Sequence, residues 1–171
     1  MIFSSIYLSS NIQLKLDEKI IYTLLLGSNL GDRNRYLMVG RELLEKHGRL
    51  LGASSIQESK AWGKTDQDDF LNQVVLLESY HTPGEMLEAI HEIEGALDRK
   101  HEVKWGPRTM DIDILYAEDR IVDLEDLKIP HPLISERQFT LVLLNEIAPE
   151  FIDPLTRKTS VQMLEKLSVT N

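Results

Sequence analysis

The sequence predicts an α+β fold of the ferredoxin-like type. Two segments carry apolar residues at helical spacing, and short apolar or β-branched runs lie before, between and after them. In chain order these elements are strand, helix, strand, strand, helix and strand, which is the split βαβ arrangement. Two more helical segments follow towards the C-terminus.

The first half of this fold is defined by strand-like runs and one helix. A buried-type strand is predicted at Tyr22–Leu26 and a helix at Arg33–His47, with Gly48 in the place of a helix C-terminal glycine. Two further strands are predicted at Leu50–Ser59 and Phe70–Glu78. The segment between them is polar and contains a glycine, so we expect a loop there.

The second helix has a specific start signal. Thr82 suits the N-cap, Pro83 the first helical position and Glu85 the third. Its inward face is expected to carry an apolar stripe, made of Met86, Leu87, Ile90, Ile93 and Leu97.

The remaining elements follow a charged loop at 98–106. We expect a strand at Thr109–Tyr116, a short edge strand at Arg120–Val122, and helices at Ser135–Asn145 and Ser160–Leu167. Residues 21–171 are predicted to form a single domain. Residues 1–20 are predicted to be an N-terminal extension of unknown role, without the basic start and cleavage site of a signal peptide.

Composition excludes several classes of function. The chain has no cysteine, so disulfides, thiolate metal sites and cysteine nucleophiles are excluded. Its formal net charge of −9 argues against a nucleic-acid-binding surface. No apolar run reaches the length of a membrane span. We therefore expect a cytoplasmic protein with neither nucleic acid nor membrane as a partner.

The most informative segment is WGPRTMDIDILY, from Trp105 to Tyr116. Residues two apart on a strand point to the same face, so Asp111 and Asp113 would present two carboxylates side by side. Such a pair is stable when a cation lies between the charges, and Mg²⁺ commonly takes one or two protein carboxylates together with phosphate oxygens. Arg108 can hold a phosphate through its planar guanidinium. The segment indicates metal-assisted chemistry on a nucleotide phosphate.

Simpler interpretations exist for these residues. Most Asp-x-Asp pairs are solvated surface carboxylates. A basic cluster precedes the aspartate pair and is made of Arg99, Lys100, His101, Lys104 and Arg108. It can be a solvated loop or a binding site for a polyanion. Its position beside the aspartate pair favours the binding site. The turn GSNLGDR lacks the spacing of a P-loop, so its role is expected to be structural.

The Trp105–Tyr116 segment closely resembles the signature of the 6-hydroxymethyl-7,8-dihydropterin pyrophosphokinase family, W-G-P-R-T-x-D-[IL]-D-[IL], and matches every fixed position. Three other blocks match in order: LLLGSNLGDR (Leu24–Arg33), DFLNQVV (Asp69–Val75) and IPHPLISERQFTLVLLNEIAPEF (Ile129–Phe151). The resemblance extends from about Tyr22 to about Pro154, and four ordered blocks make it specific.

This resemblance implies a reaction and its cofactors. The family transfers pyrophosphate from ATP, the co-substrate, to the hydroxymethyl oxygen of a reduced pterin in folate biosynthesis, and releases AMP. It implies two Mg²⁺ ions held by Asp111 and Asp113, with Arg99 and Arg108 as catalytic cations. It also implies a ferredoxin-like core to which the later helices are appended. Whether Asp113 also accepts the hydroxyl proton stays open.

A pterin needs aromatic faces and in-plane hydrogen bonds. The resemblance places pterin contacts at Ser28, Asn29, Ser59, Trp62, Phe70, Asn72 and Phe139. Phenylalanines are more often core residues than ligand contacts. The family positions of Phe70 and Phe139 favour stacking on the pterin, and that of Asn72 favours pairing with its edge.

For the nucleotide, the resemblance implies contacts at His91, Glu94, His101, Lys104, Trp105, Arg108, Ile114, His131 and Arg137. A lone histidine such as His91 is more often structural, and Trp105 can equally pack under its loop. His101 and Lys104 stand where relatives often have arginines. Lysine keeps the charge without the planar fork, and histidine keeps it only when protonated. Whether His101 and Lys104 take over the phosphate contacts of those arginines stays open.

Two other functions are compatible with parts of this sequence. A two-metal nucleotidyltransferase would share the fold and the strand carboxylates, but the acidic composition and the set of Phe70, Asn72 and Phe139 argue against it. A catalytically inactive nucleotide- or pterin-binding module would not need Asp111 and Asp113. Besides ATP and a reduced pterin, other folate-pathway enzymes are possible partners.

Overall fold

The computed structural model describes residues 18–61, 67–98 and 107–170. Its main sheet has the order β2-β4-β1-β5, and β3 pairs with β4 beside this path. All of these pairings are antiparallel. The strands are β1 (Ile20–Ser28), β2 (Arg49–Ala53), β3 (Gln57–Ser59), β4 (Phe70–Ser79) and β5 (Asp111–Ala117).

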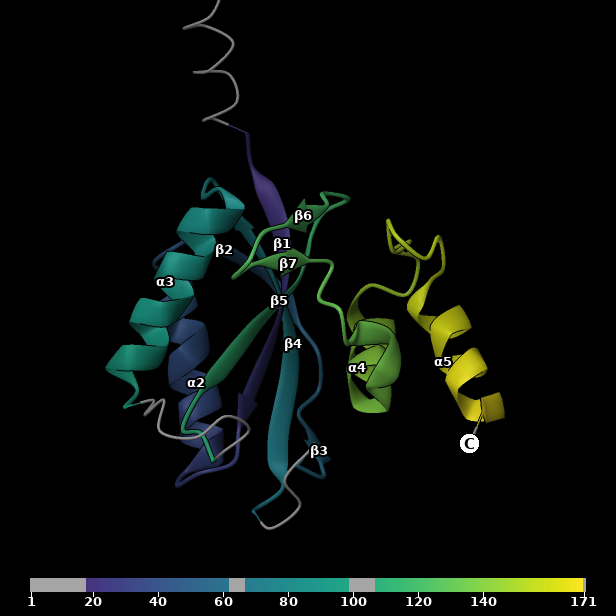
Figure 1. Cartoon of the computed structure of the whole chain (residues 1–171). Coiled ribbons are helices and arrows are strands. Elements are labelled where there is room, and N and C mark those ends of the chain that lie inside the picture. The colour runs from purple at the N-terminus through teal and green to yellow at the C-terminus, as the bar shows by residue number, and fades with distance from the viewer. Residues whose placement is uncertain (1–17, 62–66, 99–106, 171) are drawn as a thin grey trace, which may run out of the picture.

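The helices form two layers on opposite faces of this sheet (Figure 1). Helix α2 (Arg33–Leu44) connects β1 to β2, and α3 (Pro83–Ala96) connects β4 to β5. In both units the two joined strands are separated by one inserted strand. This is the split βαβ topology, so the ferredoxin-like prediction is confirmed. Helices α4 (Gln138–Ile147) and α5 (Ser160–Thr170) lie on the other face as C-terminal additions.

Strand β1 contributes residues to both hydrophobic cores. Leu24 and Leu26 belong to the core between the sheet and the helices α2 and α3, whereas Leu25 belongs to the core beneath α4 and α5. This alternation follows from the two-residue period of a strand. Because both faces of β1 are covered, its residues are almost continuously apolar.

The start of α3 agrees with the prediction. Thr82 is the N-cap, and it forms a capping box with Glu85: the Glu85 N–H donates to Thr82 Oγ1 at 3.4 Å, and the Thr82 N–H donates to Glu85 Oε2 at 2.8 Å. The apolar stripe of the helix packs on the core as expected, with Met86, Ile90 and Ile93 buried. Among the described residues, no helix is both long and apolar enough to cross a membrane.

The predicted strand Leu50–Ser59 is wrong as a single element, since it divides into β2 and β3. Ser54 lies at the break, where its Oγ accepts a hydrogen bond from the Val74 N–H at 2.9 Å and donates one to the Ser55 carbonyl at 2.8 Å. The next N–H, that of Ser55, donates to Glu146 of α4 at 2.8 Å. These side-chain contacts replace the strand ladder.

The end of the first helix also differs from the prediction. Helix α2 stops at Leu44, and among the described glycines only Gly31 has a positive φ. Gly48 is therefore not a left-handed cap. A Cβ at Gly48 would lie 2.3 Å from the Glu78 carbonyl oxygen, so this glycine permits close packing against β4.

Two later elements are also shifted. The predicted helix Ser135–Asn145 is a 3-10 turn, η1 (Ile134–Glu136), followed by α4, because Arg137 is extended with φ −103° and ψ 100°. The predicted edge strand Arg120–Val122 is instead β6 (Val122–Asp123), which pairs with β7 (Lys128–Ile129). The extended backbone at Arg137 matters for the site described next.

Candidate functional site

Two carboxylates stand at the start of β5. Asp111 pairs with Gly27 of β1, and Asp113 pairs with Leu25. Their neighbours Ile112 and Ile114 belong to the core under α2 and α3, so both aspartates point to the opposite face of the sheet. Their side chains are 20% and 29% exposed. The predicted side-by-side arrangement of the carboxylates is confirmed.

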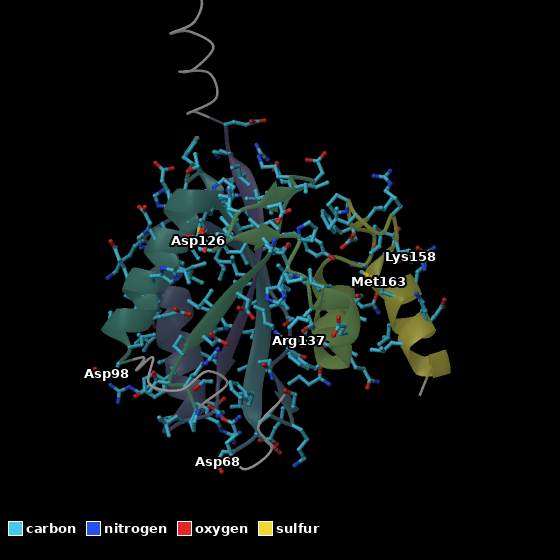
Figure 2. All side chains as sticks on the ribbon, in the orientation of Figure 1. Asp68, Asp98, Asp126, Arg137, Lys158 and Met163 are labelled. Carbon is cyan, nitrogen blue, oxygen red and sulfur yellow. The ribbon has the colours of Figure 1, made fainter. Side chains whose placement is uncertain are left out.

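Each aspartate has an arginine partner. Arg108 Nη1 lies 2.5 Å from Asp111 Oδ2, and Arg137 Nη1 lies 3.3 Å from Asp113 Oδ2. Figure 2 shows Arg137 between the sheet and α4, where the extended backbone after η1 directs it towards β5. The cations offset the repulsion between the two neighbouring carboxylates.

His131 approaches the same carboxylate from a third element. Its Nε2 lies 4.0 Å from Asp113 Oδ2, and its Nδ1 accepts the Leu133 N–H at 3.2 Å. A neutral ring that accepts at Nδ1 carries its proton on Nε2, facing Asp113. Burial lowers the pKa of His131, although the charge of Asp113 opposes this shift. Burial therefore favours the neutral ring, whose Nε2 faces the Asp113 carboxylate.

A first pocket lies over the sheet beside Asp111 and Asp113. Its wall includes four of the residues predicted to contact a pterin: Ser59, Phe70, Asn72 and Phe139. Gly27 forms part of its floor, where an added Cβ would lie 3.5 Å from both Asn72 Oδ1 and the Phe70 ring. Asn72 is fixed by its Nδ2, which donates to Ser59 Oγ at 2.9 Å. Two aromatic rings and an oriented amide therefore meet in one cavity.

A second pocket lies on the other side of the aspartate pair. It is lined by most of the described residues predicted to contact the nucleotide: His91, Glu94, Arg108, Ile114 and His131. Both pockets also share the side chains of Arg108, Asp111 and Asp113. The two cavities therefore meet at the carboxylates. Arg137, predicted for the nucleotide, lines the first pocket.

A sequence profile of the family described as 7,8-dihydro-6-hydroxymethylpterin-pyrophosphokinase (HPPK) matches residues 23–149. The chain belongs to this family. It is similar to the 2-amino-4-hydroxy-6-hydroxymethyldihydropteridine pyrophosphokinase of Aquifex aeolicus, with 42% identity over 133 residues that cover 78% of this chain and 83% of the relative. The Bacillus subtilis protein of the same name is 42% identical over 127 residues, covering 73% and 76%.

Solved structures show the same fold. The wild-type HPPK-DHPS of Plasmodium falciparum, determined with pteroate, superposes with a TM-score of 0.68 at 17% identity. The match covers 87% of this chain and 42% of that one, so this chain spans under half of the Plasmodium protein. At this identity the likeness concerns the fold alone.

Glu94, predicted for the nucleotide, also has a structural role in this family member. Its side chain is 1% exposed, and its Oε1 accepts the Ile112 N–H at 2.8 Å. Ile112 stands between the two aspartates, so this bond from α3 fixes the strand segment that carries them. His91 and Glu94 both line the second pocket, and their contact with a nucleotide stays a prediction.

The structure does not bring Ser28 and Asn29 into either pocket wall. Ser28 is fully buried, and Asn29, 1% exposed, joins neighbouring loops. Its Oδ1 accepts the Arg108 N–H at 2.7 Å, and its Nδ2 donates to the Asp68 carbonyl at 3.0 Å. The predicted sites at Trp62, Arg99, His101, Lys104 and Trp105 lie outside the described residues.

Some lining residues were missed by sequence reasoning. Lys60 and Gln67 line the first pocket, and Glu125, Asp126 and Lys128 line the second. They lie in or beside loops, where no periodicity indicates which side chains face a cavity. Only their closeness in sequence to Ser59 and His131 could have suggested them.

Proposed function

We propose that this protein transfers the pyrophosphoryl group of ATP to the hydroxymethyl oxygen of 6-hydroxymethyl-7,8-dihydropterin, releasing AMP, in folate biosynthesis. One observation carries the proposal beyond the family assignment. A pocket with aromatic walls and a polar pocket meet at Asp111, Asp113 and Arg108. An acceptor in the first pocket and a phosphate donor in the second would present their reacting atoms to each other at this junction.

The first pocket suits a pterin. Phe70 and Phe139 offer aromatic faces to a flat heterocycle. Asn72 offers its Oδ1 as an acceptor in the plane of the ring, because its Nδ2 already donates to protein oxygens. Its Nδ2 donation to Ser59 fixes which way the amide points before any ligand binds. These residues orient the acceptor so that its hydroxymethyl group faces the aspartate pair.

The second pocket suits the ATP phosphates. Arg108 lies in the wall common to both cavities, where its guanidinium can hold the phosphoryl group in transit. The hydroxymethyl oxygen loses its proton to solvent and forms a bond to the β-phosphorus, while the bond from that phosphorus to the α,β-bridging oxygen breaks, so AMP leaves. Arg108, Arg137 and His131 lie beside the aspartate pair and would stabilise the charge that develops.

The carboxylates fit a magnesium site. Asp111 and Asp113 share one face of β5, are partly exposed, and offer the hard oxygen atoms that Mg²⁺ prefers. We propose that they hold two Mg²⁺ ions together with phosphate oxygens. Bound there, Mg²⁺ supplies positive charge that orients and neutralises the phosphate oxygens. Arg108 and Arg137 contact the same two carboxylates and would help to hold them in position.

We also propose that the protein acts in the cytoplasm, where ATP is plentiful, and that it can work beside other enzymes of the same pathway. This chain matches only 42% of the Plasmodium HPPK-DHPS polypeptide, so more than half of that polypeptide lies outside the match. A neighbouring enzyme of the pathway would consume the diphosphate product.

An AMP-release assay with ATP, Mg²⁺ and 6-hydroxymethyl-7,8-dihydropterin tests the proposal. We expect AMP to form only when the pterin is present. ADP in place of AMP would mean a simple kinase. Pterin binding without any nucleotide product would mean an inactive binding module, and pterin-independent turnover would remove the pterin as the acceptor.

A further inference from the structure

A pair of histidines lies far from the aspartate site. His47 follows α2, and His81 follows β4, at the opposite end of that strand from Phe70 and Asn72. His47 Nδ1 and His81 Nε2 are 3.3 Å apart, and their ring planes are inclined at 46°. Neither ring belongs to the two pockets at Asp111 and Asp113. The proposed transfer reaction does not use this pair.

Both histidines are anchored through their backbones to buried side chains. Ser79, 2% exposed, donates from Oγ to the His47 carbonyl at 2.6 Å and accepts the His81 N–H at 3.1 Å. Tyr22, fully buried, donates from its hydroxyl to the His81 carbonyl at 2.6 Å. The two rings are therefore brought together by a rigid frame, which reduces the conformational entropy lost when a ligand binds between them.

The separation of the two nitrogens matches that of two ligands on one metal ion. With Zn–N distances of about 2.0–2.1 Å and tetrahedral angles, two coordinating nitrogens lie roughly 3.3–3.4 Å apart. Without a metal, the same distance allows one ring to donate an N–H to the other. A metal ion bound by both nitrogens would take the place of that proton.

We propose that His47 and His81 form a second metal site, which binds one divalent transition metal ion of the Zn²⁺ type. Imidazole nitrogen suits Zn²⁺, Ni²⁺ and Cu²⁺, and does not suit Mg²⁺. Among the described residues, no group of three or more His, Cys, Asp or Glu is arranged to hold a metal, so solvent completes the coordination.

The charges around the pair are mostly positive, because Lys19, Lys46 and Arg49 line the same pocket, so the affinity for a metal ion must come from the two imidazole nitrogens. The pocket that contains both rings also contains Glu78, which pairs with Lys19 at 2.9 Å and with Arg49 at 3.8 Å. Burial, and then the neighbouring His81, lower the pKa of His47, while Glu92 acts against this shift and Lys46 reinforces it. The neutral, metal-binding form of His47 therefore persists at lower pH than in a free histidine.

A bound ion would join two corners of the fold. His47 lies between α2 and β2, and His81 between β4 and α3, so the metal would connect the end of one helix to the start of the other. An ion that binds the folded chain and not the unfolded chain raises the unfolding temperature. The predicted role is structural and independent of pyrophosphoryl transfer.

Calorimetric titration of the full chain with Zn²⁺, at a fixed excess of Mg²⁺, tests this site. We expect one Zn²⁺ per chain and a higher unfolding temperature. His47→Gln and His81→Gln should each weaken the binding at least about tenfold. His91→Gln removes a histidine outside the pair, and the double variant Asp111→Asn/Asp113→Asn removes the other metal site. Both controls should bind Zn²⁺ like the wild type.

Three results would overturn the proposal: no Zn²⁺ binding by the wild type, unchanged binding by both pair variants, or loss of binding in the Asp111→Asn/Asp113→Asn double variant. If the His47→Gln and His81→Gln variants fail to fold, nitrogen NMR of the histidine rings in the wild-type protein tests the proposal instead. Zn²⁺ should then shift the signals of two of the five histidines. Shifts at other rings, or at none, would refute the site.

Discussion

Asn29 and Arg108 are 79 residues apart in sequence and are joined by two hydrogen bonds. The Arg108 N–H donates to Asn29 Oδ1 at 2.7 Å, and the Asn29 N–H donates to the Arg108 carbonyl at 3.0 Å. The other half of the same amide, Nδ2, donates to the Asp68 carbonyl and to Gln67 Oε1. One buried side chain therefore joins the turn after β1 to the segments that precede β4 and β5.

Asn29→Ala should lower both stability and activity. It leaves the Arg108 N–H without its side-chain acceptor, and an unsatisfied buried group costs about 1–3 kcal/mol. Asn29→Asp keeps this acceptor but buries a charge and turns a carboxylate oxygen towards the Asp68 carbonyl, so it should be at least as destabilising as Asn29→Ala. Urea unfolding and AMP release measure both effects. Wild-type stability in Asn29→Ala would show that the loops are held by other contacts.

Asp111→Asn and Asp113→Asn should each reduce AMP release by at least about 10²-fold. Each variant removes a negatively charged ligand of the proposed Mg²⁺ ions, which neutralise the charge of the phosphate oxygens. Pterin binding, followed by fluorescence, should largely survive, since the aromatic walls are unchanged. Asp119→Asn, an exposed aspartate just beyond β5, is the matched control and should behave like the wild type. Full activity in either pair variant would disprove the metal assignment.

Glu94→Ala and Glu94→Gln should differ in stability. Alanine leaves the buried Ile112 N–H without its acceptor at Oε1, a loss of roughly 1–3 kcal/mol in the free energy of unfolding. Glutamine retains a carbonyl acceptor at the same place and should be milder. Denaturant unfolding separates the two variants, and equal destabilisation by both would mean that the negative charge of Glu94, not the hydrogen bond, is what matters.

His131 should make the stability depend on pH. The pKa of the folded protein's His131 is lowered below its ordinary value of 6.5, chiefly by burial, so the unfolded chain binds more protons in the interval between the two values. The free energy of unfolding should fall as the pH drops from 6.5 through the lowered pKa. His131→Asn should flatten this part of the curve. His47, whose pKa is also lowered, gives a second contribution that His47→Gln should remove.

Much of the fold could be predicted because the local signals agree with the tertiary structure. The capping box of Thr82 and Glu85 and the apolar stripe of α3 fixed the second helix. The division of the strand after α2 could not be predicted, because it depends on Glu146, which lies 91 residues from Ser55 in sequence. The place of Gly48 likewise depends on a carbonyl of β4 rather than on its own helix.

The aspartate pair could be predicted because a strand fixes the direction of residues two apart. The resemblance supplied Phe70, Asn72 and Phe139, and the structure places all three at one pocket. The role of Asn29 as a connector could not be predicted from its turn, because its partners come from two remote loops. The position of Arg137 depends on the break between η1 and α4, which the apolar periodicity of the segment conceals.

The wall of Arg108, Asp111 and Asp113, common to both pockets, has a thermodynamic consequence. Any occupant of one pocket changes the field and the side-chain positions of the other, so the two affinities are linked. Linkage is reciprocal: the factor by which ATP changes the affinity for the pterin must equal the factor by which the pterin changes the affinity for ATP. The preferred order of binding is then decided by ligand concentrations and rates, because this coupling energy is the same along either route.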